Sequence, residues 1–311
     1  MSNRKAGIEH MTKKNNVSDW SGSDKVRLII MIFPFLSLFL LFTVVPVLSS
    51  VVLSFFNYDM LNAPRFTGLS NYFRMFVEDE VFLISLKNTL KLSVVTGPLG
   101  FMLSFVLAWM INEFGKNART VLSFLFYSPA LMGNVYFIWQ IMFSGDSYGY
   151  VNSFLTSLNI ISEPIQWFQN TKYALTLVMV VQLWMSMGIS FLANIAGLQN
   201  VNTELYEAGA VDGIRNRWQE LWYITLPSMK TILLFSAVMQ IQATFSISSV
   251  ATILTGSPSV NYCTETIVTH LTDVSALRFE MGYASAISVF LFLLMAITRL
   301  LIGKLLNSTG K

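Results

Sequence analysis

The chain alternates between long apolar runs and shorter polar connections over most of its length. A helix needs about 20 apolar residues to cross the roughly 30 Å hydrocarbon core of a bilayer. Such runs are too long and too continuous for the strands of a membrane barrel. Six runs reach the required length, at residues 28–56, 88–112, 120–143, 173–198, 231–255 and 281–303. The pattern therefore predicts an all-α integral membrane protein with six transmembrane helices.

These runs divide the chain into a tail (1–27), a transmembrane domain (28–306) and a short C-terminal tail (307–311). A signal peptide is a competing interpretation of the first run. However, the stretch from Leu28 to Phe56 is about twice the length of the apolar region of a signal peptide, and it lacks a convincing small-residue cleavage site. We therefore expect the first run to be retained as a helix.

Composition supports a membrane protein, because 54% of residues are hydrophobic and 12% are charged, against roughly 25% charged residues in soluble domains. The single Cys263 excludes an intramolecular disulfide, and two histidines with one thiol give no metal-ligand cluster. We expect no metal site and no nucleic-acid partner.

Basic residues are distributed unequally between the two sides of the predicted helices. Lys and Arg near the ends of spans are retained on the cytoplasmic side. The N-terminal tail, the 113–119 and 199–230 connections and the C-terminal end hold fourteen of the 20 basic residues, whereas the other side holds Arg65, Arg74, Lys172 and Arg278. Lys87 and Lys91 lie at the outer end of the second span. Both termini are therefore expected in the cytoplasm.

The 199–230 connection contains the charged stretch ELYEAGAVDGIRNRWQELWYITLP at residues 204–227. Thr203 is a suitable N-cap, Glu204 and Glu207 complement the positive end of a helix dipole, and Gly213 suits a left-handed residue beyond the end. This predicts a helix of about nine residues. Small residues such as Gly209 would let a second protein surface approach closely, although the same charges also suit an ordinary solvated loop.

The detailed pattern favours a docking helix. Glu207-Ala208-Gly209, Asp212-Gly213 and Ile224-Thr225-Leu226-Pro227 together resemble the EAA signature of permease subunits of bacterial ABC importers. Other stretches are similar to the maltose and glycerol-phosphate type of sugar permease, specifically its first-permease branch. They are FTGLSNYFRMF (66–76), NTL (88–90), YSPALMGNVYFIWQIMF (127–143) and IAGLQNV (195–201).

The resemblance implies the type I permease fold, with a coupling helix between spans four and five that sits in a cleft of a cytoplasmic ATPase. Its contact residues would be Glu207, Ala208, Gly209, Ala210, Asp212, Gly213 and Pro227. Gly209 departs from the signature, which has a second alanine there. Because glycine within a helix costs about 1 kcal/mol relative to alanine, we expect this helix to depend more on its partner for order.

The resemblance also implies the partners. They are a second, homologous permease, a dimer of the ATPase and an extracytoplasmic solute-binding protein in the bacterial cytoplasmic membrane. This chain would bind no cofactor, while ATP and Mg would bind to the ATPase. Carbohydrate, a mono- or oligosaccharide, would cross by alternating access.

Two series of polar residues suggest where a sugar could pass. Each recurs at every fourth position and so traces a slowly rotating stripe along one side of a helix. Amides and hydroxyls both donate and accept hydrogen bonds, as a polyhydroxylated solute requires, and nearby indole rings could cover a sugar ring. The residues are Gln182, Ser186, Ser190 and Asn194, then Ser236, Gln240, Thr244 and Ser248, with Trp139 and Trp184 as the aromatic groups. The same side chains could equally link neighbouring helices without contacting substrate.

Two other classes of function were considered. An ion-coupled secondary transporter of a polar solute would need ionisable residues within its spans, where this chain has only Lys91 and Arg299 near span ends. A membrane enzyme would need a catalytic motif, and the sequence contains no HExxH pair and no acidic pair inside a span. It also lacks a Walker A loop, so a separate subunit must hydrolyse ATP. We therefore expect a transport subunit without catalytic residues.

Overall fold

The structure is a computed structural model that describes residues 22–132 and 135–308, with side chains at 26–132 and 135–304. Residues 1–21, most of the expected N-terminal tail, lie outside the described residues. So do Gly133 and Asn134 of the 127–143 stretch, and residues 309–311 of the C-terminal tail. The chain divides into two compact units between Val52 and Leu53, and each unit is described by itself.

The first unit is one continuous helical rod. It consists of α1 (Gly22–Phe39), a π-helical turn η3 (Leu40–Val44) and α2 (Val45–Leu53). The segment Val26–Leu53 is strongly apolar over 28 residues, and none of its side chains is buried. An apolar helix of this length with an exposed surface suits a lipid environment, in agreement with the first predicted span.

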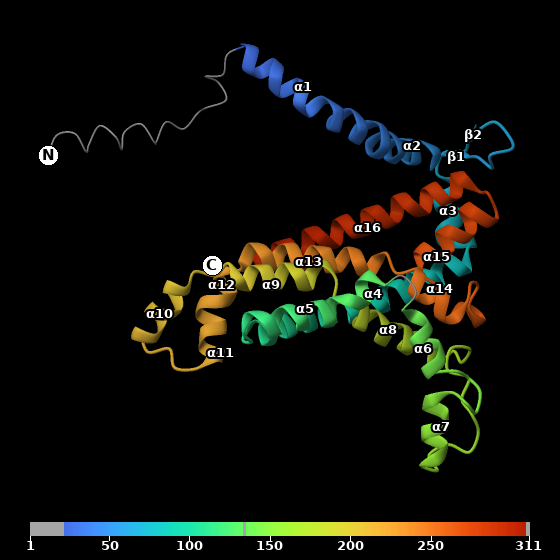
Figure 1. Cartoon of the computed structure of the whole chain (residues 1–311). Coiled ribbons are helices and arrows are strands. Elements are labelled where there is room, and N and C mark those ends of the chain that lie inside the picture. The colour runs from blue at the N-terminus through green and yellow to red at the C-terminus, as the bar shows by residue number, and fades with distance from the viewer. Residues whose placement is uncertain (1–21, 133–134, 309–311) are drawn as a thin grey trace. The chain divides into compact units, whose positions relative to one another are not determined.

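The second unit carries the remaining elements (Figure 1). Its first half contains β1 (Phe56–Asn57), β2 (Arg65–Phe66), α3 (Ser70–Phe73), η4 (Arg74–Glu78), α4 (Glu80–Asn112), α5 (Lys116–Leu131), α6 (Tyr136–Met142) and α7 (Tyr150–Ser157). Its second half contains α8 (Ala174–Met185), α9 (Ile189–Gln199), α10 (Thr203–Val211), α11 (Arg217–Glu220), η5 (Leu221–Thr225), α12 (Leu226–Ser228), α13 (Lys230–Phe245), α14 (Ser249–Thr255), η6 (Val260–Tyr262), α15 (Ile267–Thr272), η7 (Asp273–Leu277) and α16 (Met281–Ser308).

Five helical segments of the described chain are long and apolar enough to cross a membrane. They are Val26–Leu53, Glu80–Asn112, Ala174–Gln199, Lys230–Thr255 and Met281–Lys304. The run at 120–143, which we expected to be one span, instead forms α5 and α6, and these helices are bent relative to each other by 83°. Pro129 lies in the last turn of α5, where its ring and missing N–H disfavour continuation of the helix. The six expected spans are obtained if this bent pair counts as one.

A two-residue antiparallel ladder is the exception to the all-α prediction. Phe56 pairs with Phe66 and Asn57 pairs with Arg65, and the two phenylalanine rings meet edge to face at 5.4 Å. The pairing lies in the polar connection between the first two spans and so leaves the membrane-spanning helices unaffected.

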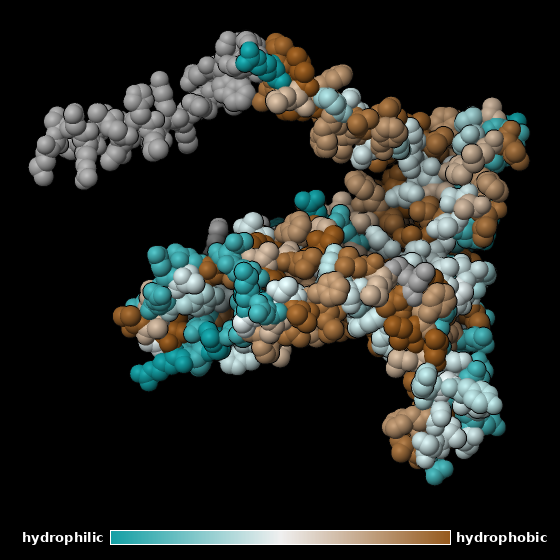
Figure 2. All heavy atoms as spheres, in the orientation of Figure 1, coloured by the Kyte–Doolittle hydropathy of each residue, from teal (hydrophilic) through white to brown (hydrophobic). Residues whose placement is uncertain are grey.

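Helix α4 lies at the centre of the second unit. It packs against α9 and α13, and also against α8, α5 and α15. Its Phe105, Ala108 and Ile111 join one buried cluster with residues of α9 and η5, while its Leu92 belongs to a second cluster and its Phe82 to a third. Within this unit, α10 and α11 lie at one end of α9 and α13. Figure 2 shows that hydrophilic residues gather over that end.

Candidate functional site

The helix predicted in the 199–230 loop forms as α10, which runs from Thr203 to Val211 and has nine residues. Its N-cap, however, is Asn202 rather than Thr203, because the Asn202 side chain accepts a hydrogen bond of 3.1 Å from the Glu204 N–H. Thr203 is the first helical residue instead. Beyond the C-terminal end, Gly213 has a φ of +94°, the left-handed conformation expected from its position.

The two faces of α10 have different surroundings. Gly209 is buried, and a Cβ at this position would lie 2.6 Å from Ile224 Cδ1 and 3.1 Å from Ile214 Cδ1. On the same side, the hydroxyls of Tyr206 and Thr225 lie 2.9 Å apart. The small size of Gly209 therefore admits η5 of the same chain, which supports α10 from within the loop.

The opposite face of α10 is open. Leu205 is 45% exposed and Val211 is 88% exposed, an unusual exposure for such apolar side chains. Of the residues expected to contact an ATPase, all but Gly209 are exposed, namely Glu207, Ala208, Ala210, Asp212, Gly213 and Pro227. The loop thus presents a mixed apolar and acidic surface.

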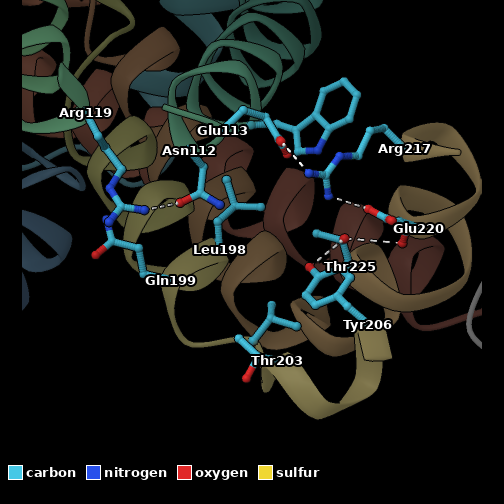
Figure 3. A pocket seen from close by; sticks show the side chains of 12 residues that line it. Asn112, Glu113, Arg119, Leu198, Gln199, Thr203, Tyr206, Arg217, Glu220 and Thr225 are labelled. Atoms are coloured by element: carbon cyan, nitrogen blue, oxygen red, sulfur yellow. Dashed lines mark hydrogen bonds and ion pairs between the residues drawn. The ribbon is translucent and has the colours of Figure 1, made fainter. Parts of the chain in front are cut away.

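Helix α11 joins the loop to the end of α4 (Figure 3). Asn216 caps α11 by accepting a 2.9 Å hydrogen bond from the Gln219 N–H. Arg217 Nη1 lies 2.7 Å from Glu220, and its Nη2 lies 3.0 Å from Glu113, which follows α4. The hydrogen bond to Glu220 and the charge of Glu113 raise the pKa of Arg217. Exposed ion pairs of this kind stabilise by roughly 0.2–1 kcal/mol.

A polar hollow of about 450 Å³ lies beneath these ion pairs. Asn112, Arg119 and Tyr206 are among the residues that line it, and Arg119 donates to Asn112 at 3.0 Å. Trp109 of α4 and Trp218 of α11 are also in contact, with ring centroids 5.3 Å apart. The loop and the end of α4 are therefore joined by a few side chains around an open space.

Two membrane-spanning segments are interrupted near their middle, which the sequence interpretation did not anticipate. The segment 174–199 loses helical geometry between α8 and α9, at Ser186–Gly188, and the segment 230–255 does so between α13 and α14, at Ser246–Ser248. Non-helical backbone at membrane depth is tolerated only where it is buried in protein or lines a water-filled cavity. Each break must therefore be buried in protein or line a water-filled space.

A cavity of about 370 Å³ lies at these breaks. Four residues of the predicted stripes line it, namely Gln182, Ser186, Ser190 and Gln240. Gln242 and Ser246 line it as well. Neither residue belongs to the two series with a spacing of four, so the sequence pattern did not predict them. The amide of Gln242 inside an apolar span was nevertheless a signal of a polar environment.

Among the other stripe residues, Ser236 and Asn194 link neighbouring helices. Ser190 and Ser236 exchange hydrogen bonds to each other's carbonyl oxygens at 3.1 and 3.3 Å, which ties α9 to α13. Asn194 donates to the Ser104 hydroxyl of α4 at 3.4 Å, and Thr244 donates to the Ile241 carbonyl of its own helix at 2.8 Å. Some stripe residues therefore line the cavity and others link helices, while Ser190 does both.

Gln240 stands out because its side-chain Nε2 is buried and has no hydrogen-bond partner among the described residues. Its residue is only 2% exposed. Leaving such a donor unpaired costs roughly 1–3 kcal/mol. This nitrogen lies against Gly100 of α4, because a Cβ at Gly100 would collide with it.

The two tryptophans lie near the polar cavity but do not line it. Their ring centroids are 5.7 Å apart. Trp184 faces a separate apolar cavity of about 500 Å³, lined by residues such as Leu125, Pro129 and Met187. Trp139 stacks on Phe143 at 5.9 Å. Trp139 and Trp184, which we expected to cover a sugar ring, are therefore not among the residues that line the polar cavity in this structure.

Comparison with known proteins identifies the family. The protein family described as the binding-protein-dependent transport system inner membrane component matches residues 97–308. These residues include both cavities and the 199–230 loop. The chain belongs to this family.

Relatives and solved structures agree with this family. A probable ABC transporter permease protein, YesP of Bacillus subtilis (strain 168), is 33% identical over 279 residues, which are 88% of each chain. The arabinooligosaccharides transport system permease protein AraP of Halalkalibacterium halodurans is 27% identical and covers 92% of this chain and 89% of its own. The lactose transport system permease protein LacF of Rhizobium radiobacter is 27% identical and covers 85% and 88%.

The fold is also shared with a bacterial ABC transporter involved in the import of alginate, an acidic polysaccharide. The TM-score is 0.76 at 22% identity, over 93% of this chain and 98% of that chain. The protein is thus a multi-pass membrane permease of an ABC transport system, and not an enzyme. This membership decides against the ion-coupled secondary transporter considered from the sequence.

Proposed function

We propose that this permease imports a neutral carbohydrate, and that the cavity at the two helix breaks is the part of the pathway that contacts it. The lining of this cavity by amides and hydroxyls from both interrupted spans is the observation that carries the proposal. A sugar hydroxyl can accept hydrogen bonds from such amides and can donate in turn to the oxygens of neighbouring amides and serines.

The lining of the cavity favours a neutral solute. It contains amides, hydroxyls, methionines and small residues, and no acidic or basic side chain. An acidic polysaccharide such as alginate carries carboxylates, whose burial without a cation is unfavourable. Relatives are named for arabinooligosaccharides and lactose, which are neutral, and for sulfoquinovosyl glycerol and polygalacturonan, which are acidic. The lining, and not the relatives, therefore supports a neutral solute.

A second permease subunit would complete the pathway. Gln242, Ala243 and Ser246 line the cavity and are exposed in this chain. An amide facing hydrocarbon is unfavourable, so this side of α13 must meet protein or water. A homologous permease placed against it would enclose the cavity and exclude lipid.

The open face of α10 would contact the ATPase that drives transport. Since the sequence has no Walker A loop, ATP and Mg would bind to that cytoplasmic dimer and not to this chain. The excess of basic residues on the side of the 199–230 loop supports a cytoplasmic position for that loop and for both termini, and the membrane would be a bacterial cytoplasmic membrane. Sugar would arrive from a solute-binding protein, and differential contacts in two global states would couple hydrolysis to alternating access.

The proposal is tested by coexpressing the chain with a second permease, an ATPase and a solute-binding protein from the same genome, and reconstituting the complex in proteoliposomes. Uptake of radiolabelled arabinotriose, lactose and an alginate trisaccharide is measured with and without internal ATP. We expect ATP-dependent, binding-protein-dependent uptake of a neutral sugar. Uptake of the alginate trisaccharide alone, or uptake driven by an ion gradient without ATP, would overturn the proposal.

A further inference from the structure

Helix α4 contacts both the 199–230 loop and two residues that line the polar cavity, Ser186 and Gln240, at two different levels. At the loop end, Glu113 bonds Arg217 at 3.0 Å and Trp109 contacts Trp218 at 5.3 Å. Beneath these contacts, Ile111 of α4 belongs to the same buried cluster as Leu221 and Ile224 of η5. The loop is therefore attached to α4 as well as to α9 and α13, with which it is continuous in sequence.

At the cavity level, α4 approaches the lining residues very closely. A Cβ at Gly100 would collide with the side-chain amide of Gln240 and would lie 3.1 Å from Ser186 Cβ. Gly100 is thus in direct contact with both interrupted spans. Any displacement of α4 at this point must move Gln240 or Ser186.

The segment between these two levels is suited to transmit movement. Gly100 and Glu113 are separated by about 20 Å along the helix axis at 1.5 Å per residue. Pro98 lies before Gly100, and no proline follows it in α4. Ser104, Phe105 and Ala108 are buried along this segment, so a continuous, packed helix connects the loop to the cavity.

We propose that Arg217 is a positioning residue which, together with Trp218, transmits movement of the 199–230 loop to α4 and through Gly100 to the polar cavity. This inference rests on the proposed function, because it names the route by which the ATPase would change the cavity. Arg217 suits the role because Glu220 of its own helix orients the guanidinium, while its second bond reaches Glu113 on α4. The pair is exposed and lines an open polar hollow, so its bonds can be rearranged without disturbing the buried cluster beneath it.

Covalent continuity through α9 and α13 is the alternative route, and a charge-swap cycle separates the two. The experiment uses the assembled complex with Cys263→Ser, which removes the only native cysteine of this chain, and Ser246→Cys at the cavity. The rate of labelling by a membrane-impermeant maleimide is measured on the band of this chain, with and without saturating MgATP. Copurified ATPase is quantified for every variant.

The complex with Cys263→Ser and Ser246→Cys is the parent for all variants. We expect MgATP to change its labelling rate at least fivefold. Arg217→Glu and Glu113→Arg should each reduce that change to less than twofold, and the double variant should restore at least half of it. Arg215→Glu is the matched control, because it reverses a charge in the same loop at a residue with no ion pair in the described structure. It should retain the response of the parent.

The outcomes are distinct. The transmission role is wrong if MgATP changes the labelling rate of the single variants as much as that of the parent. It is also wrong if the double variant shows no larger change than either single variant, or if Arg215→Glu reduces the change as much as Arg217→Glu does. Loss of the ATPase from the Arg217→Glu complex would place Arg217 in docking and would also overturn it. If MgATP does not change the labelling rate even in the parent, the proposed function itself is wrong. The parent alone reveals this outcome, so it is distinguished from a failure of the Arg217 proposal.

Discussion

The two ends of α4 are held in opposite ways. At its N-terminal end, Asp79 caps the helix by accepting from the Phe82 N–H at 2.9 Å, and its other oxygen accepts from Tyr283 at 2.6 Å and from His270 at 3.0 Å. The His270 side chain is 2% exposed. At the C-terminal end, Glu113 meets Arg217 with side chains that are 41% and 64% exposed.

The N-terminal end is also reinforced by its neighbours. Arg74 lies 2.6 Å from Glu280 and 4.2 Å from the centre of the Tyr283 ring. Three elements, η4, α15 and α16, thus converge on the start of α4. The contacts of Asp79 with the buried His270 and Tyr283 hold one geometry, whereas the exposed contact of Glu113 beside an open hollow can be rearranged. The polar contacts of α4 are therefore anchored at one end and adjustable at the other.

The largest effect should come from the anchored end. Asp79→Ala removes the N-cap and leaves the Tyr283 hydroxyl and the His270 N–H without their acceptor, so we expect a loss of about 2–4 kcal/mol in the free energy of unfolding. Glu113→Ala at the other end is the control, with an expected loss of at most about 1 kcal/mol. Thermal unfolding of both variants in the same detergent measures the difference. Equal losses would remove the distinction between the two ends.

A second prediction concerns the loop at the adjustable end. Gly213→Pro imposes a φ near −65° where the structure has +94°, and Glu207→Lys reverses a charge on the open face of α10. The helix dipole contributes only about 0.3–1 kcal/mol at Glu207, so a large effect must come from the docking surface. We expect more than a tenfold loss of binding-protein-stimulated ATP hydrolysis in each variant, with a normal yield in membranes.

Gly68→Pro is the matched control for this prediction, because Gly68 also has a positive φ, of +59°, but lies beside β2. It should leave the stimulation of ATP hydrolysis unchanged. Normal ATPase retention and stimulation in both Gly213→Pro and Glu207→Lys would refute the assignment of α10 as the coupling helix.

The third prediction lies between the two ends, at the cavity. Gln240→Leu and Gln182→Leu remove amides from its lining, and we expect sugar uptake to weaken by about three- to tenfold, equivalent to roughly 0.7–1.4 kcal/mol, while complex assembly is preserved. Ser236→Ala is the comparison, because it breaks the α9–α13 link and should lower the yield of complex. Wild-type affinity and rate in both glutamine variants would show that these residues do not line the pathway.

The smallest effect concerns pH. Burial alone would raise the pKa of Asp79, but hydrogen bonds from His270, Tyr283 and the Phe82 N–H hold this pKa well below its usual range. A depressed carboxyl pKa contributes stability above the unfolded value of about 3.9, and this contribution is lost as the pH falls through the folded pKa. The contribution of Asp79 should therefore be nearly constant from pH 8 to 5 and decline only below about pH 4. Unfolding of the wild type and of Asp79→Asn across this range measures it, and an Asp79-dependent loss between pH 7 and 5 would contradict the low pKa.

The local features of the 199–230 loop could be predicted because they depend on residues close in sequence. The bounds of α10 and the positive φ of Gly213 follow from capping and from glycine's lack of a Cβ. The choice between Asn202 and Thr203 as the N-cap could not be predicted, because both side chains can cap and the entry angle of the chain decides between them. A close neighbour at Gly209 was predicted as the surface of a second protein, but the neighbour in this structure is Ile224 of the same chain, and this contact depends on how η5 folds back.

At the cavity, too, the sequence predicted some features, and others depended on the tertiary structure. Polar residues at a spacing of four correctly predicted that Gln182, Ser186, Ser190 and Gln240 would come together. The periodicity could not reveal the breaks at Ser186–Gly188 and Ser246–Ser248, because hydrophobic length is preserved across them. These breaks bring Ser246 to the cavity and leave Ser236 and Asn194 to link helices.

By itself, the sequence determined the membrane class, the apolar segments, the short helix of the loop and the family resemblance, since each depends on composition, periodicity or local motif. Only the tertiary structure decided that α4 connects the loop to the cavity. Glu113 and Arg217 are 3.0 Å apart although 104 positions separate them in the sequence, and Gly100 meets Gln240 across 140 positions. Contacts of this kind arise from the packing of whole helices, and no local propensity or hydrophobic period encodes them.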